Sequence, residues 1–358
     1  MINNKYFEEV TDMSLTYHET KTQYSALRET FKLLEEQKEA LNKFFGGCKP
    51  KSITFIGCGS SFYISQSFET MARVKLGIPS ASLPAGDLML HYEEYREALK
   101  DTLLVAVSRS GSTSEIVNAI TNVKSIVNVP VLSVTCIENS QLEKLSDFCL
   151  VLPWAFDESV CQTRTVSNLY ATVLHIIAGW AGKDKVIGDI DRAVGAGSAF
   201  LERYEEKFKA VAELAWENVV VVADGEIHGL AKEGALAFQE ISQIPSNCYH
   251  LLDARHGPIV MIGADTLVIA AVTENNTACQ IDFIKEIIKK GAKVIVYSDA
   301  KIAAIDGAVL QACSELQADY AVRGLPFINI CQMVSYYKAI KRQVNPDKPS
   351  GLDAWIKL

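Results

Sequence analysis

Short apolar runs alternate along the chain with longer stretches in which apolar residues recur at helical spacing. The first run, 52–56, is rich in β-branched and aromatic residues and leads through glycines into a helical pattern over 62–76. Similar apolar runs follow at 103–107, 131–134 and 149–152, with helical patterns over 114–127 and 141–145. This rhythm predicts an α/β fold in which a parallel sheet is flanked by helices.

The same rhythm starts again in the second half. Helical patterns over 166–182 and 189–215 lead to a new apolar strand at 219–223. Before the first strand of the chain, an amphipathic helix is predicted over 17–45. The offsets between strands of equal rank are 166 for Ile53 and Val219, 164 for Leu103 and Leu267, and 163 for Val131 and Val294. Offsets this similar suggest an internal duplication, although two unrelated α/β domains of equal size would produce part of the pattern.

Composition and charge narrow the class of protein. The chain has 358 residues, enough for about two domains, and 49% of them are hydrophobic. With 35 Lys and Arg against 43 Asp and Glu, the net charge of −8 argues against a nucleic-acid partner. No apolar run is long enough to span a membrane and the N-terminus lacks the pattern of a signal peptide, so we expect a cytoplasmic protein with no membrane partner.

Cysteine and histidine spacing indicates neither a disulfide framework nor a metal site. The nine cysteines are scattered and none forms a C-x-x-C pair, and the six histidines form no ligand-spaced pair. We therefore expect no metal and no cofactor.

The first strand ends in a candidate anion-binding loop, Gly57-Cys-Gly-Ser-Ser61. Gly59 allows close backbone approach, and Ser60 and Ser61 stand where the following helix begins, a position that favours a phosphate. The loop lacks the spacing of a dinucleotide-binding fingerprint and the Lys of a nucleotide-binding P-loop. Taken alone it is equally well explained as a tight turn with Ser caps.

A second loop strengthens the first. The segment Ser108-Arg-Ser-Gly-Ser-Thr113 also follows an apolar strand and precedes a helix. Its hydroxyl residues are Ser108, Ser110, Ser112 and Thr113. Because the carboxyl ends of parallel strands share one edge of a sheet, both loops can hold one phosphate. Arg109 adds charge there, unless it points to the surface.

Candidates for proton transfer lie in the second half. Glu233 and Glu240 are seven residues apart on one predicted helix, and His256 follows in a loop just before Gly257 and Pro258. Glu240 as base and His256 as acid suit proton transfer beside a carbonyl, unless the carboxylates simply form a solvated helix face.

In these motifs the chain resembles the sugar isomerase (SIS) domain family. The likeness is to the isomerase half of glutamine–fructose-6-phosphate aminotransferase and to related phosphosugar deglycases, deaminases and isomerases. It covers roughly 35–345 and rests on both Ser-rich loops, on Glu233-Gly-Ala with Glu240-Ile-Ser, and on His256-Gly-Pro.

The resemblance implies two tandem flavodoxin-like SIS domains and a sugar 6-phosphate, or an amino-sugar or fructosamine 6-phosphate, held by the Ser/Thr loops. It implies Glu240 as the base that moves a proton between C1 and C2, and His256 as the residue that opens the sugar ring or acts as acid. In relatives this His comes from a second subunit, which implies a homodimer. Asp157 matches an acidic position that shapes the site, unless it is a surface acid.

The implied domains are a helical extension over 1–34, SIS domains over 35–185 and 186–345, and a tail over 346–358 near the active site. No N-terminal Cys follows Met1, so no glutamine-hydrolysing domain is expected. Ala237 and Ala354 stand where the aminotransferase carries lysines, which places its covalent route in doubt.

The resulting expectation is a deglycase that splits fructosamine 6-phosphates into a sugar phosphate and an amine. An amino-sugar-phosphate deaminase or an aldose–ketose isomerase uses the same enediol chemistry and fits almost as well. A non-catalytic sugar-phosphate sensor is a hypothesis of a different class, and an NAD-dependent oxidoreductase is a more remote one. The sensor needs only the phosphate loops, so the presence of both Glu240 and His256 favours an enzyme.

Overall fold

The protein is described by a computed structural model of residues 14–275 and 277–358. The chain divides into two compact units. The N-terminal unit comprises Gln23–Asp157, Arg164–Gly188 and Asp353–Leu358. The C-terminal unit comprises the residues up to Thr22, then Glu158–Thr163 and Asp189–Leu352. Residues 1–13, where a signal peptide would lie and where the predicted extension begins, are outside the described part.

A five-stranded parallel sheet forms the centre of the N-terminal unit, in the order β2-β1-β3-β4-β5. Its strands are β1 (Ser52–Gly57), β2 (Ser80–Pro84), β3 (Thr102–Ser108), β4 (Val131–Thr135) and β5 (Phe148–Val151). All seven residues of β3 are buried, as expected for a central strand covered on both faces.

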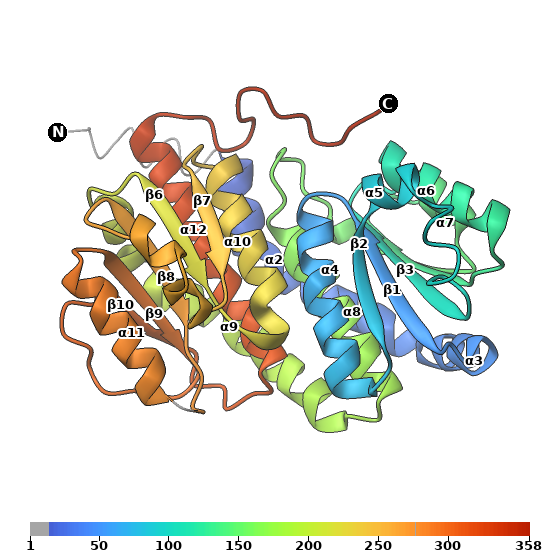
Figure 1. Cartoon of the computed structure of the whole chain (residues 1–358), viewed down its shortest axis with the longest axis horizontal. Coiled ribbons are helices and arrows are strands. Elements are labelled where there is room, and N and C mark those ends of the chain that lie inside the picture. The colour runs from blue at the N-terminus through green and yellow to red at the C-terminus, as the bar shows by residue number, and fades with distance from the viewer. Residues whose placement is uncertain (1–13, 276) are drawn as a thin grey trace. The chain divides into compact units, whose positions relative to one another are not determined.

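Helices cover both faces of this sheet (Figure 1). They are α4 (Ser60–Met71), which continues as a π-helical turn over Ala72–Leu76, then α5 (Ala85–Leu90), α6 (Ser114–Ile126), α7 (Gln141–Leu145) and α8 (Arg164–Trp180). On one face, Leu104 and Ala106 of β3 pack with Ile116 and Ile120 of α6 in a single buried cluster. Burial of this apolar area is the main stabilising contribution to the unit.

The sheet of the C-terminal unit repeats the topology in the order β10-β9-β8-β6-β7. Its strands are β6 (Asn218–Val222), β7 (Ser246–Tyr249), β8 (Thr266–Ala271), β9 (Lys293–Ser298) and β10 (Leu310–Cys313). Read in chain order, both sheets follow the same sequence of parallel pairings, second-first-third-fourth-fifth. This shared order agrees with the predicted duplication.

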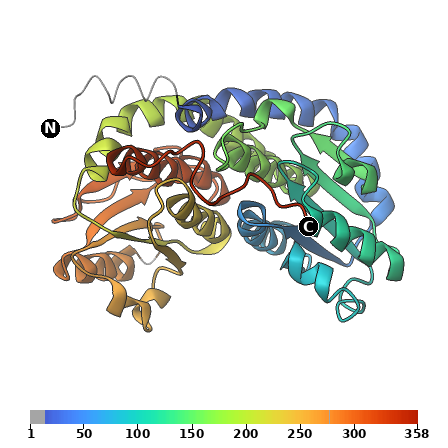
Figure 2. The same ribbon diagram turned by 90° about the horizontal axis from the view of Figure 1, so that it is seen from above.

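Helices cover both faces of the C-terminal sheet. Val268 and Val294 pack with Phe283 of α11 (Thr277–Lys289) on one face. On the other face the ring of Tyr297 lies 5.6 Å from that of Phe327 in α12 (Gly324–Arg342). Figure 2 shows α12 (dark red) and α11 (orange) on opposite sides of the sheet. The alternation of the two faces along each strand follows from its two-residue period.

The predicted α/β fold with two parallel sheets is confirmed, and three edge strands were not predicted from the sequence. These are β2, β7 and β10, which are short and contain exposed or half-buried residues. The helix predicted over 17–45 is two helices, α2 (Leu15–Glu36) and α3 (Lys38–Cys48), because the chain turns at Gln37. No Gly or Pro marks this turn. The long helix before β6 is α9 (Asp184–Ala212).

No helix in the described part of the chain is both long and apolar enough to cross a membrane. The nine cysteines are all free thiols.

Gly111 provides a test of how tightly the β3–α6 loop is built. Its φ is +58°, and a Cβ added there would lie 2.5 Å from Ser140 Oγ and 2.7 Å from Thr135 Oγ1. We expect Gly111→Ala to lower the free energy of unfolding by about 2 kcal/mol or more, because strain and overlap add. Denaturant unfolding followed by circular dichroism measures this change.

Gly86→Ala is the matched control in the same unit. A Cβ at Gly86 would have its nearest neighbour at an ordinary 3.9 Å. Its stability should change by no more than about 1 kcal/mol. Equal effects of the two substitutions would contradict the close packing of Gly111.

Candidate active site

The first candidate loop joins β1 to α4 through two glycines with different roles. Gly57 lies so close to the helix that a Cβ would be 2.5 Å from the carbonyl carbon of Ser61. Gly59 has φ +54° and ψ −126°, a conformation that side chains disfavour. The Ser61 N–H closes the turn by donating to Cys58 O at 3.1 Å. The glycines therefore bring the helix start directly onto the strand end.

The hydroxyls at this helix start have unused hydrogen-bonding capacity. Ser60 and Ser61 are buried, and neither hydroxyl bonds to another residue within 14–275 or 277–358. Burial raises the pKa of the neighbouring Cys58 thiol to about 12, so this residue is protonated at neutral pH and is not a nucleophile. The loop can offer hydroxyl donors to a ligand without offering a thiolate.

The second candidate loop uses serine oxygens to shape itself. Ser108 Oγ accepts the Gly111 N–H at 3.1 Å, and Ser110 Oγ accepts the Ser112 N–H at 3.2 Å. Ser110 Oγ also lies 3.4 Å from Thr113 Oγ1. A hydroxyl that accepts from a backbone N–H keeps its own hydrogen for donation. The loop is thus ordered and still able to donate to an oxyanion.

The two loops lie at the same edge of the sheet. Strands β1 and β3 are direct parallel neighbours, with Ile56 opposite Ala106, so the loops that follow them emerge side by side. In the order β2-β1-β3, the chain leaves β1 and β3 in opposite lateral directions, which is where open α/β sheets bind ligands. The structure thereby places the two loops that carry the predicted hydroxyl residues next to each other.

Arg109 is buried, which contradicts the expectation that it could point to the surface. Its Nη1 donates to Asp157 O at 3.4 Å and its Nη2 donates to Ala354 O at 2.7 Å. The guanidinium also lies 5.8 Å from the ring centroid of Phe156. Arg109 therefore ties the loop to two other segments of the same unit. Ala354 stands where a lysine is expected in the aminotransferase. It takes part in this contact through its main-chain carbonyl oxygen.

Asp157 is not a surface acid either. Its side chain is buried, Oδ2 accepts the Thr165 N–H at 2.9 Å, and Oδ1 lies 3.6 Å from Arg164 Nε. It thus satisfies a donor in the first turn of α8, where a negative charge is favourable. The sequence spacing gave no sign of this cap, because Asp157 lies seven residues before the helix begins.

In the C-terminal unit, Glu240 is the last residue of α10 (His228–Glu240) and is half-buried. Glu233 is buried within the same helix, so a solvated helix face is wrong for this carboxylate. Ala237 packs with Cys161 and Ile241 in an apolar cluster one turn before Glu240. At position 237, where a lysine is expected in the aminotransferase, this chain therefore has a small side chain that is part of the apolar core.

His256 is exposed at the end of the 3₁₀ helix η4 (Asp253–Arg255). The backbone N–H of His256 donates to Asp253 O at 2.8 Å, and Gly257 follows with φ +118°. This glycine allows the chain to turn sharply into η5 (Pro258–Met261) and leaves the imidazole on the surface. The predicted loop position of His256 agrees with the structure.

A histidine pair that sequence reasoning missed holds the start of the His256 segment. Asp224 Oδ1 accepts from His250 Nδ1 at 3.0 Å and from the Leu251 N–H at 3.3 Å. The His250 ring stacks on His228 with centroids 3.7 Å apart. Burial lowers the pKa of His228 to about 4, and its Nδ1 donates to Ala223 O at 2.9 Å, so this ring is neutral at physiological pH. No sequence pattern indicates the cluster.

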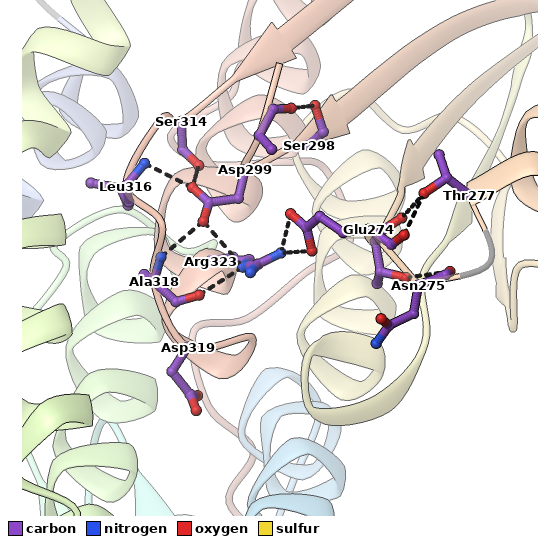
Figure 3. Close-up of polar contacts among 12 residues, drawn as sticks. Glu274, Asn275, Thr277, Ser298, Asp299, Ser314, Leu316, Ala318, Asp319 and Arg323 are labelled. Carbon is purple, nitrogen blue, oxygen red and sulfur yellow. Dashed lines mark hydrogen bonds and ion pairs between the residues drawn. The ribbon is translucent and has the colours of Figure 1, made fainter. Parts of the chain in front are cut away.

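The loops of the C-terminal sheet that correspond to the Ser-rich loops are acidic. By strand rank, Glu274 corresponds to Ser110 and Glu226 to Ser60. Figure 3 shows Arg323 between Glu274 and Asp299: its Nη1 lies 2.8 and 2.7 Å from the two Glu274 oxygens, and its Nε lies 3.3 Å from Asp299 Oδ2. Carboxylates repel a phosphate, so at these two described positions the C-terminal unit is less suited to one than the N-terminal unit.

No group of three or more His, Cys, Asp or Glu residues suited to a metal ion occurs in the described residues.

A model of the SIS domain family matches residues 48–178 and 214–308, which is well over half of the chain. Among curated proteins, the chain is 24% identical over 317 residues to glutamine–fructose-6-phosphate aminotransferase of Photorhabdus laumondii, covering 85% of this chain and 51% of that protein. The corresponding enzyme of Methanothermobacter thermautotrophicus is 25% identical, with 92% and 55% covered. The chain thus spans about half the length of these relatives.

Solved structures show the same fold. Glucosamine-6-phosphate deaminase from Thermotoga maritima superposes with a TM-score of 0.80 at 24% identity, covering 96% of this chain and 100% of that one. Tagatose-6-phosphate ketose/aldose isomerase from Escherichia coli gives 0.82 at 20% identity, with 96% of each chain covered. Together with the two parallel sheets and their glycine-bounded loops, the family match establishes that this chain belongs to the SIS domain family.

Proposed function

We propose that this chain is an enzyme that binds a 6-phosphorylated sugar and moves a proton between C1 and C2. The observation that carries the proposal is the pair of adjacent loops with available hydroxyls at the carboxyl edge of the N-terminal sheet. The names of the relatives support the substrate class, because they specify fructose 6-phosphate, glucosamine 6-phosphate and tagatose 6-phosphate.

The phosphate is bound by neutral donors in this proposal. Its ligands are the hydroxyls of Ser60, Ser61, Ser108, Ser110, Ser112 and Thr113. Gly59, Arg109 and Asp157 shape the loops, which agrees with the buried contacts of the two charged residues. Binding of the remote phosphate supplies energy that orients the reacting carbons.

Glu240 is the proposed base and His256 the proposed ring-opening acid. In the open chain, Glu240 removes the proton from C1 and forms an enediol, or an enaminol where C1 carries an amine. Return of the proton to C2 completes an isomerisation. With an amine on C1 the product is an imine, which water converts to the free aldehyde as the C1–N bond breaks and the amine leaves.

A fructosamine 6-phosphate is the substrate we favour, which would make the protein a deglycase. The support is the apolar environment of Ala237 and the alanine at 354, since neither position offers an amine for covalent capture of the sugar. The likeness in fold to a deaminase and an isomerase keeps amino-sugar-phosphate deamination and aldose–ketose isomerisation as the second candidate.

A homodimer that shares its active sites is part of the proposal. His256 is exposed, and Leu252, Val260 and Met261 around it are 40%, 77% and 72% exposed. An apolar patch of this kind beside a reactive His fits a surface covered by a second copy of the chain. We propose that His256 acts in the partner's site.

We further propose SIS domains over 35–185 and 186–345, with the tail 346–358 beside the active site. Two hydrogen bonds support this position of the tail: Ala354 O accepts from Arg109 of the β3–α6 loop, and Ile356 O accepts from the Ser114 N–H at the start of α6. A cytoplasmic location is proposed because nine free thiols suit a reducing compartment.

Proton NMR in heavy water tests the reaction and the role of Glu240. We expect exchange at C1 or C2 with fructose 6-phosphate, glucosamine 6-phosphate or 6-phosphofructoselysine, and release of lysine from the last. Glu240→Gln should lower the rate about 100-fold or more with little change in affinity, the usual scale for loss of a general base. A rate close to wild type in this variant would refute the assignment; ammonia release or isomerisation without lysine release would favour the second candidate.

Loss of loop hydroxyls should weaken binding. Ser108→Ala combined with Ser110→Ala is expected to raise the dissociation constant for the sugar phosphate about tenfold or more, because hydrogen bonds to a charged group are lost. Isothermal titration calorimetry measures the effect. Ser125→Ala, at the opposite end of α6 where the hydroxyl bonds to Asn122 O, is the control and should bind normally. Unchanged affinity in the double variant would place the phosphate elsewhere.

Mixing two inactive variants tests the shared site. Glu240→Gln and His256→Ala dimers, unfolded and refolded together, should regain about one quarter of wild-type activity, because half of the chains form hybrids with one intact site each. Each variant refolded alone is the control. Absence of recovery in hybrids confirmed by native mass spectrometry would show that both residues act within one chain.

A further inference from the structure

A buried carboxylate near the N-terminus holds the segment 158–163 of the C-terminal unit. Glu19 is 2% exposed, and its Oε1 accepts the N–H groups of Glu158 and Ser159 at 2.6 and 3.2 Å. The Ser159 hydroxyl donates to its other oxygen. A buried carboxylate needs several donors to offset the loss of water, and this segment supplies three.

The C-terminal end of the unit holds the next residue of the segment. The Val160 N–H donates to Asp347 O at 2.9 Å. The Asp347 carboxylate is fixed in turn at the start of α2, where it accepts from Ser14 Oγ, Leu15 N and Thr16 N at 2.8, 3.0 and 2.8 Å. Three consecutive N–H groups of the segment are therefore bonded to residues from near the two ends of the chain.

The anchored segment lies against the helix turn that carries Glu240. Cys161 packs in one buried cluster with Ala237 of α10 and with Ile241, the residue that follows Glu240. The next residue, Gln162, has a buried Oε1 with no hydrogen-bond partner among the residues that the structure describes. An unpaired buried amide oxygen is costly, so it is suited to accept from a hydroxyl or amine of a bound sugar.

We infer that Glu19 is a positioning residue, which sets the main chain of 158–163 so that this segment and Glu240 meet the substrate in a fixed arrangement. The inference rests on the proposed proton transfer by Glu240. It adds a residue that lies outside both segments matched by the SIS family model, 48–178 and 214–308. Glu19 touches neither reacting atoms nor Glu240 in this role. It acts through Glu158 and Ser159, whose N–H groups it fixes.

Glu19→Gln is the principal test, because the amide replaces one acceptor oxygen with a donor facing other donors while keeping the size of the side chain. We expect kcat for C1/C2 proton exchange to fall about 10- to 100-fold, the scale of a small misplacement in an active site, with KM changed less than about threefold. Ser159→Ala removes only the hydroxyl contact and should lower kcat by a smaller factor. Amide hydrogen exchange at 158–159 should accelerate in Glu19→Gln.

Glu205→Gln is the matched control. Glu205 also accepts from residues of α2, namely Tyr17 Oη at 2.6 Å and Lys21 Nζ at 2.6 Å, and from Tyr337 Oη at 2.7 Å. It belongs to the same unit and has no hydrogen bond to 158–163. Its substitution should lower the melting temperature and leave kcat of the folded enzyme unchanged.

The outcomes separate this inference from the function beneath it. If the wild type is active and the Glu19→Gln variant is equally active, the positioning role is overturned, even if amide hydrogen exchange at 158–159 accelerates. Equal losses of kcat in Glu19→Gln and Glu205→Gln would reduce the role to general stability and also overturn it. If the wild type exchanges no C1 or C2 proton of any of the three sugar phosphates, both the proposed function and this inference are refuted.

Discussion

The two parallel sheets impose one constraint on everything else in this protein: their central strands are buried on both faces. Every residue of β3 and of β8 is buried. Side chains that are to meet a ligand therefore have to lie beyond the strands, and parallel strands end at one shared edge. The position of the Ser-rich loops follows from this constraint, since β1 and β3 are neighbours and their loops emerge together.

The two sheets share their topology but differ in the chemistry of that edge. In the N-terminal unit the loop after β3 uses serine oxygens to accept its own N–H groups and keeps hydroxyl hydrogens available. The corresponding loop after β8 carries Glu274, paired with Arg323, whose guanidinium also approaches the buried Asp299. An internal ion pair has thus replaced the features that suit an external anion. The same topology thus carries free hydroxyl donors at the edge of one sheet and an internal ion pair at the edge of the other.

Much of the architecture was predictable because it depends on local patterns. The central strands are continuous apolar runs, and the helices between them have clear periodicity, so the fold class followed from the sequence. The edge strands β2, β7 and β10 lacked such a signal because one side of each has no neighbouring strand and several of their residues are exposed. The turn at Gln37 was missed because its cause is not a helix-breaking residue.

The sequence by itself determined the order of the elements, the glycines that permit tight loops, and the residue types gathered at the strand ends. Only the tertiary structure decided which polar groups form hydrogen bonds with other residues of the chain. Arg109 reaches Ala354 O, and Glu19 reaches the N–H groups of Glu158 and Ser159, across separations of 245, 139 and 140 positions. Local spacing contains no information on such pairs, because a buried charge takes whatever partner the packing of distant segments brings within hydrogen-bonding distance.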